Sequence, residues 1–346
     1  MNVTPASIPS SPLQKAQENI ANILRLAFEH GDKNDAVVVW DSNSELARML
    51  VQAYRHCLPQ ALFVDFDASE PSKIQATFES LKPNDLVVLV QSTNFRLHSF
   101  RIRMELFKRS LKVIEHPHLG RMPAEQSAIY IDALAYDLDY YRGTGKALKR
   151  LIDATEQATV TSAGESLVFS AGLEPAKLNV GDYRELNNTG GQFPIGEVFT
   201  ESKDLEAVNG RLRIAFFGDT SFRVNQPPTP IGLSIEAGRV VQTCDSTPAF
   251  EQVLSEIRNH EGQVWLRELG FGMNRALSPT RTVSDIGTFE RMCGVHLSLG
   301  AKHASYNKPN IRKKAARFHV DVFAALDAVH LDDLSIFHNG AWVLPL

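Results

Sequence analysis

Short apolar runs alternate with amphipathic stretches over the first half of the chain. The runs at residues 35–41 (DAVVVWD), 61–67 (ALFVDFD) and 85–90 (DLVVLV) are typical of parallel strands that are buried on both faces. Residues 13–30, 42–56 and 74–81 repeat apolar positions at helical spacing. This order of helices and strands predicts an α/β domain with a doubly wound, mostly parallel sheet.

From about residue 160 the pattern changes to short alternating runs separated by turn signals. Asn209-Gly210, Ala237-Gly238 and Asn339-Gly340 each stand between such runs and predict hairpins, because both positions of a tight hairpin turn need positive φ. One helix is predicted here, near residues 248–258. The chain is therefore expected to have a flexible N-terminus (1–15), an α/β domain (16–160) and a β-rich α+β domain (161–346).

Composition indicates a globular protein, with 43% apolar and 22% charged residues among 346. A formal charge of −4 gives no reason to expect a nucleic-acid or membrane partner. The three cysteines form no CxxC pair, the N-terminus lacks the pattern of a secretory signal, and no apolar run approaches the roughly 20 residues of a membrane helix. These features predict a cytoplasmic protein.

The N-terminal sheet carries no signal for nucleotide binding. No GxGxxG follows the run at residues 35–41, where a dinucleotide needs glycines for close backbone approach. The segment Gly143-Thr144-Gly145-Lys146 lacks the four-residue spacer of a phosphate-binding loop and the Ser or Thr after its lysine. The candidate chemistry therefore lies in the second half.

Carboxylates and histidines recur within the apolar runs of that half. In RFHVDVF (317–323), His319 and Asp321 would share one face of a strand, which suits either a divalent cation or a hydrogen-bonded surface pair. His296 lies inside GVHLSLG (294–300), where it is expected to be either a histidine of the core or a metal ligand. Glu268 shares a face with apolar residues, so it requires an Arg, a Lys or a metal ion beside it. Glu197 begins a strand after a Pro-Ile-Gly turn.

Together these five residues predict a site with oxygen and nitrogen ligands and no thiolate. Such a set suits Zn²⁺, Co²⁺, Mn²⁺ or Fe²⁺. With several carboxylates available, one could bridge two ions and help to activate a water.

The succession GEVFT, RELGFGMN, GVHLSLG and FHVDV over residues 190–346 resembles the thermophilic metallo-aminopeptidases of aminopeptidase T type. The resemblance implies a homodimeric hydrolase that removes N-terminal residues from small peptides with two divalent metal ions, such as Zn, Co or Mn. It implies as metal ligands Glu197, Glu268, His296, His319 and Asp321. It also makes Glu290 a candidate catalytic carboxylate, beside Glu197.

The sequence departs from the family where a tyrosine normally follows the HLxLG histidine by seven residues. His303 stands there, as a ligand, a transition-state donor or a surface residue. Two other functions stay open. One is an Fe²⁺ ring-cleaving dioxygenase of the dihydroxypyridine type, whose relatives resemble this chain in architecture. The other is a non-catalytic protein that keeps the fold to bind a small molecule or a partner.

Overall fold

A computed structural model describes residues 11–345 apart from 32, 98, 99, 185, 187 and 313. The predicted flexible segment at 1–15 lies mostly outside these residues, although a helix begins at Pro12. The described chain forms two compact units. The first contains the residues up to Tyr136 together with Asp182–Pro194, and the second contains Asp137–Gly181 and Ile195 onward. None of the described helices is long and apolar enough to cross a membrane.

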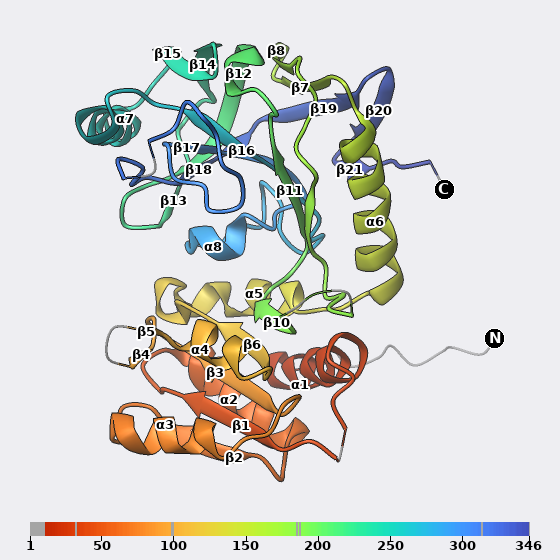
Figure 1. Cartoon of the computed structure of the whole chain (residues 1–346), viewed down its shortest axis with the longest axis vertical. Coiled ribbons are helices and arrows are strands. Elements are labelled where there is room, and N and C mark those ends of the chain that lie inside the picture. Colours follow the sequence, from red (N-terminus) through yellow and green to blue (C-terminus); the bar gives the residue numbers. More distant parts are fainter. Residues whose placement is uncertain are drawn as a thin grey trace, which may run out of the picture. The chain divides into compact units, whose positions relative to one another are not determined.

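The first unit has a parallel five-stranded sheet in the order β10-β6-β3-β1-β2 (Figure 1). The three predicted strands are confirmed, and the prediction of a parallel α/β sheet is confirmed with them. The strands are β1 (Ala36–Trp40), β2 (Leu62–Asp65), β3 (Leu86–Val90), β6 (Lys112–His116) and β10 (Gly190–Gln192). The α-helices are α1 (Pro12–Asn22, continued by a π-helical turn at Ile23–Ala27), α2 (Glu45–Cys57), α3 (Pro71–Glu79), α4 (Ile102–Lys108) and α5 (Ser127–Ala133).

The second unit is built on a large antiparallel sheet, as the alternating pattern predicts. Its main path runs β21-β20-β19-β7-β8-β12-β18-β17-β16-β11-β9, with β13 and β14 paired to β12 and β15 paired to β14. The strands are β7 (Ala158–Ser162), β8 (Glu165–Phe169), β9 (Lys177–Asn179), β11 (Glu197–Glu201), β12 (Val208–Gly218), β13 (Val224–Asn225), β14 (Ile231–Glu236), β15 (Arg239–Cys244), β16 (Leu266–Gly272), β17 (Gly294–Leu299), β18 (Val320–Ala324), β19 (Leu326–Leu331), β20 (Leu334–His338) and β21 (Ala341–Trp342). Its α-helices are α6 (Leu138–Ala154), α7 (Pro248–Glu261) and α8 (Ile286–Phe289).

Two of the three predicted hairpin turns are confirmed. Ala237-Gly238 joins β14 to β15 and Asn339-Gly340 joins β20 to β21, each with two positive φ angles. The prediction at Asn209-Gly210 is wrong, because both residues lie inside β12. Gly210 pairs there with β8 on one side and β14 on the other, and a Cβ would fall on the carbonyl oxygen of Ser166. The glycine lets the neighbouring strands lie close together and does not form a turn.

The core of the first unit contains a buried histidine with a defined proton arrangement. The hydroxyl of Tyr54 lies 2.7 Å from His116 Nε2, and that of Tyr130 lies 2.8 Å from His116 Nδ1. Tyr130 donates to the Phe193 carbonyl at 3.0 Å, so its oxygen accepts from His116 Nδ1 and Tyr54 donates to Nε2. The imidazole is therefore neutral, and burial lowers the pKa of His116 from about 6.5 to about 3.

This burial predicts acid sensitivity. Between about pH 6.5 and pH 3 the unfolded chain binds a proton at His116 that the folded chain does not, so stability is full above this window and falls as the pH falls. The loss approaches about 1.4 kcal/mol per pH unit. The free energy of unfolding, measured with urea at pH 7, 6, 5 and 4, should fall less steeply with decreasing pH in His116→Gln than in the wild type. The exposed His56 supplies the control His56→Gln. If the unfolding free energy depends on pH equally in His116→Gln and in the wild type, this account is wrong.

Candidate metal centre

Strand register places carboxylates and imidazoles on one face of four neighbouring strands in the second unit. Glu201 of β11 lies opposite Glu268 of β16, and Gly270 of β16 lies opposite His296 of β17. Ser298 of β17 lies opposite Asp321 of β18. Because paired residues of antiparallel strands point to the same face, and alternate residues do too, Glu197 and these side chains all rise from one surface.

A glycine makes room for the central imidazole. Gly270 lies beneath His296, and a Cβ at residue 270 would overlap the imidazole ring. The main chain at Gly270 does not need positive φ, so the requirement is space and not backbone freedom. The LGFG segment thus allows His296 to lie flat against β16.

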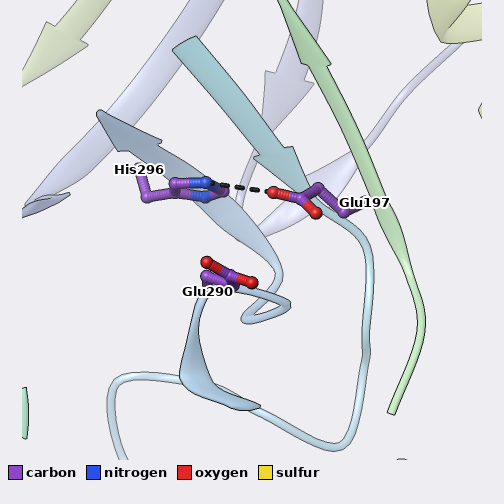
Figure 2. Close-up of side chains that lie close together, drawn as sticks. All are labelled: Glu197, Glu290 and His296. Carbon is purple, nitrogen blue, oxygen red and sulfur yellow. Dashed lines mark ion pairs between the residues drawn. The ribbon is translucent and has the colours of Figure 1, made fainter. Parts of the chain in front are cut away.

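Glu197, Glu290 and His296 form one compact group of side chains that could hold a metal ion (Figure 2). One ligand atom from each lies within 4.8 Å of the others. Glu290 is the residue directly after α8, and Glu197 is the first residue of β11. His296 Nε2 is 3.2 Å from Glu197 Oε1 and 3.2 Å from Glu268 Oε1. His296 therefore lies between two glutamates that are 71 positions apart in the sequence.

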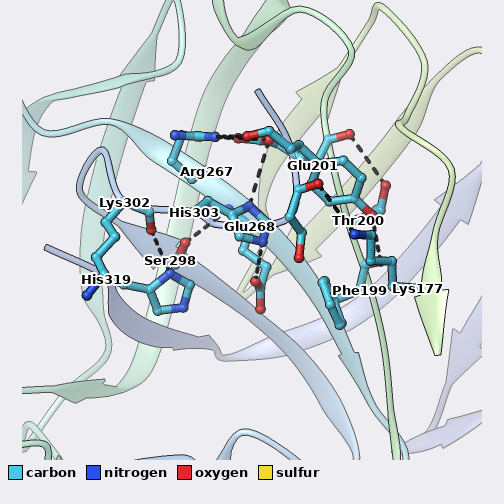
Figure 3. Close-up of polar contacts among 12 residues, drawn as sticks. Lys177, Phe199, Thr200, Glu201, Arg267, Glu268, Ser298, Lys302, His303 and His319 are labelled. Atoms are coloured by element: carbon cyan, nitrogen blue, oxygen red, sulfur yellow. Dashed lines mark hydrogen bonds and ion pairs between the residues drawn. The ribbon is translucent and has the colours of Figure 1, made fainter. Parts of the chain in front are cut away.

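His319 and Asp321 lie side by side, as the HxD pattern predicts. His319 Nε2 is 3.1 Å from Asp321 Oδ1, although β18 itself begins at Val320. The carbonyl of Lys302 accepts a hydrogen bond from His319 Nδ1 at 3.0 Å (Figure 3). Because a carbonyl can only accept, the proton of a neutral His319 is on Nδ1 and the lone pair of Nε2 faces the cluster. Asp321 Oδ1 is buried and makes no hydrogen bond.

Glu201, Arg267 and Arg291 are members of the site that the sequence interpretation missed. Arg267 and Glu201 form an ion pair in which both side chains are at most 1% exposed. Arg291 Nη1 lies 3.2 Å from Glu197 Oε2 and also contacts Glu290. Period-2 alternation in EVFTE could have identified Glu201, because it shares a face with Glu197. No local pattern identifies the two arginines.

The cluster has more negative than fixed positive charge. Five carboxylates meet two guanidinium groups, and the carboxylates are Glu197, Glu201, Glu268, Glu290 and Asp321. Burial alone would lower the pKa of His296, but Glu197 and Glu268 outweigh it and raise that pKa to about 10. Against the same effect of burial, Asp321 and Glu268 raise the pKa of His319 to about 9. The field of the cluster thus attracts positive charge strongly.

The donor set fits a divalent cation. Carboxylate oxygens and imidazole nitrogens without thiolate are ligands for Zn²⁺, Co²⁺, Mn²⁺ and Fe²⁺. The nitrogen and oxygen atoms of each pair lie 2.9–3.2 Å apart, so both atoms of a pair could contact one cation. A cation would also replace the protons that the imidazoles otherwise hold, since metal binding releases protons from its ligands.

Comparison with known proteins identifies the fold. Neither family models nor curated protein sequences match the chain. Among solved structures, it is similar to wild-type AmpT, an aminopeptidase T from Thermus thermophilus. The identity is 13%, the TM-score is 0.58, and the match covers 96% of this chain and 100% of AmpT. The resemblance inferred from GEVFT, RELGFGMN and FHVDV is therefore confirmed at the level of the fold: the chain has the architecture of aminopeptidase T.

Proposed function

We propose that the protein is a metal-dependent hydrolase that removes N-terminal residues from peptides. The observation that carries this proposal is the convergence of Glu197, Glu290 and His296 within 4.8 Å, next to Glu268. His319 and Asp321 belong to the same face and extend the donor set. The fold shared with an aminopeptidase supports a peptide substrate.

Glu268 is the central side chain of the proposed site. Its Oε1 lies 3.2 Å from His296 and its Oε2 lies 2.9 Å from His303, so its two oxygens face two different imidazoles. It would hold divalent ions together with Glu197 and His296 on one side and with His319 and Asp321 on the other, and Glu290 lies beside Glu197 and His296. When bound, divalent ions at these residues would lower the pKa of a water and polarise a peptide carbonyl.

Glu290 is the best candidate for moving the proton. Its side chain is 18% exposed, whereas those of Glu197, Glu268 and Asp321 are 6–8% exposed. A general base has to exchange its proton with solvent, so the more accessible carboxylate suits this role. Arg291 contacts both Glu290 and Glu197 and holds them in place, because a guanidinium group forms directed hydrogen bonds with carboxylates.

The proposal is tested by metal dependence. Protein stripped with a chelator should lose hydrolysis of aminoacyl amides, and Zn²⁺, Co²⁺ or Mn²⁺ should restore it. Metal that binds only the native state should also raise the melting temperature, with a stabilisation of about 2.7 kcal/mol at a hundredfold excess over Kd. A chain that retains no metal and hydrolyses amides equally with and without chelator would refute the proposal. Oxygen uptake with Fe²⁺ and a dihydroxypyridine would support the dioxygenase instead.

A further inference from the structure

We propose that His303 supplies an additional nitrogen ligand to the metal centre, and that the buried pair Glu201–Arg267 positions it there. This inference rests on the proposed function, because it assigns a further residue to the same site. It makes the centre richer in imidazole than the five ligands implied by the sequence.

His303 occupies a buried position between two carboxylates (Figure 3). Its side chain is 5% exposed, its Nε2 lies 2.9 Å from Glu268 Oε2, and its Nδ1 lies 3.8 Å from Glu201 Oε2. Neither nitrogen is in hydrogen-bond geometry, although buried polar atoms almost always are. In the neutral tautomer with its proton on Nδ1, toward Glu201, the lone pair of Nε2 faces the nearby oxygen of Glu268 and would repel it. A cation held jointly by these two atoms removes the conflict.

Glu201 faces the opposite nitrogen of His303. Its side chain is fully buried, and Arg267 binds both of its oxygens, so its charge is fixed in place. A carboxylate on the Nδ1 side of a histidine favours the tautomer with the proton on Nδ1 and leaves Nε2 free to bind metal. Glu201 therefore has the position of an orienting residue, without being a ligand itself.

Arg267 also fixes the backbone on both sides of His303. It donates to the carbonyl of Ala301 and, at 3.3 Å, to that of Tyr306. A single buried guanidinium group thus holds Glu201 and the loop that carries His303. Such an arrangement restricts the imidazole to one place, which is what a metal ligand on a loop requires.

Two further side chains anchor the same loop beyond His303. The hydroxyl of Tyr306 donates to the carbonyl of Pro175 at 2.8 Å. The ammonium group of Lys308 is buried and donates to Glu174 Oε1 and to the carbonyl of Ser202, each at 2.5 Å. Exposed loops rarely bury a lysine, so this one is built to keep a fixed shape.

The added imidazole should affect the choice of metal. Imidazole nitrogen favours Zn²⁺ and Co²⁺, whereas carboxylate oxygen suits Mn²⁺ better. His303→Ala should therefore weaken Zn²⁺ and Co²⁺ binding at least tenfold and change Mn²⁺ binding much less. Glu201→Gln should weaken Zn²⁺ binding about tenfold or more, as loss of a group that orients a ligand does.

The test is a titration of the full chain with Co²⁺, Zn²⁺ and Mn²⁺, followed by calorimetry and by the visible absorption of bound Co²⁺. His338→Ala, which removes an exposed histidine on β20, is the matched control and should behave as wild type. A changed cobalt spectrum and weaker binding in His303→Ala support the inference. If His303→Ala binds Co²⁺ with the wild-type spectrum and affinity, the inference is overturned while the proposed function stands. A wild-type chain that binds none of the three ions overturns both.

Discussion

Replacing Glu268 with glutamine is expected to lower metal affinity and kcat/KM by at least about a hundredfold, the upper end of the loss seen for removal of supporting groups alone. Glutamine keeps the size of the side chain and removes its charge. Glu268 contacts both His296 and His303, and its carboxylate also raises the pKa of His319. No other carboxylate of the cluster acts on all three imidazoles. Calorimetry with Zn²⁺ and the hydrolysis rate of an aminoacyl amide would measure the effect.

The matched control is Glu236→Gln, which removes an exposed glutamate from β14 of the same unit. It should leave metal affinity and hydrolysis within about twofold of wild type, since exposed surface substitutions have small effects. If Glu268→Gln retains wild-type metal affinity while remaining folded, Glu268 is not a ligand and its central role in the site is wrong.

Gly270→Ala is expected to have the second largest effect. The new Cβ would overlap the imidazole of His296, so either the ring or β16 has to shift. Overpacking of this kind costs about 1–3 kcal/mol of stability. Since His296 lies between Glu197 and Glu268, its displacement should also reduce metal affinity at least tenfold. Urea unfolding and metal calorimetry report the two effects separately.

Two variants separate crowding from a general effect of losing a glycine. Gly143→Ala in α6 adds a Cβ where no atom lies within 4 Å, and should stabilise the helix by about 0.5–1 kcal/mol. In Gly270→Ala/His296→Ala the clash is absent, so stability should recover while metal affinity stays low. Equal destabilisation by Gly270→Ala with and without His296 would show that the imidazole is not the group it displaces.

Part of the fold can be predicted from the sequence, because fully buried parallel strands consist of unbroken apolar runs. The runs at 35–41 and 85–90 became β1 and β3 for this reason. β10 could not be predicted, since its residues Gly190–Gln192 carry no apolar side chain. It joins the first sheet through backbone pairing with β6, which depends on tertiary structure alone.

The candidate site divides in a similar way. Alternation along RELGFG predicts that Glu268 is buried and therefore needs positive partners. The identity of those partners depends on which strands are neighbours. Arg267 is adjacent to Glu268 in the sequence but forms its ion pair with Glu201. Arg291 lies in a loop far along the chain and forms an ion pair with Glu197. Long-range pairing of this kind leaves no local signal.

The account depends on a divalent cation bound among Glu197, Glu268, Glu290 and His296. The most direct measurement is anomalous X-ray scattering from a crystal grown with Zn²⁺ or Mn²⁺, recorded on both sides of the metal's absorption edge. We predict an element-specific peak in contact with Glu268 and His296, with a second near His319 and Asp321. A chain that takes up metal at other residues only, and leaves this cluster without a peak, would contradict the account.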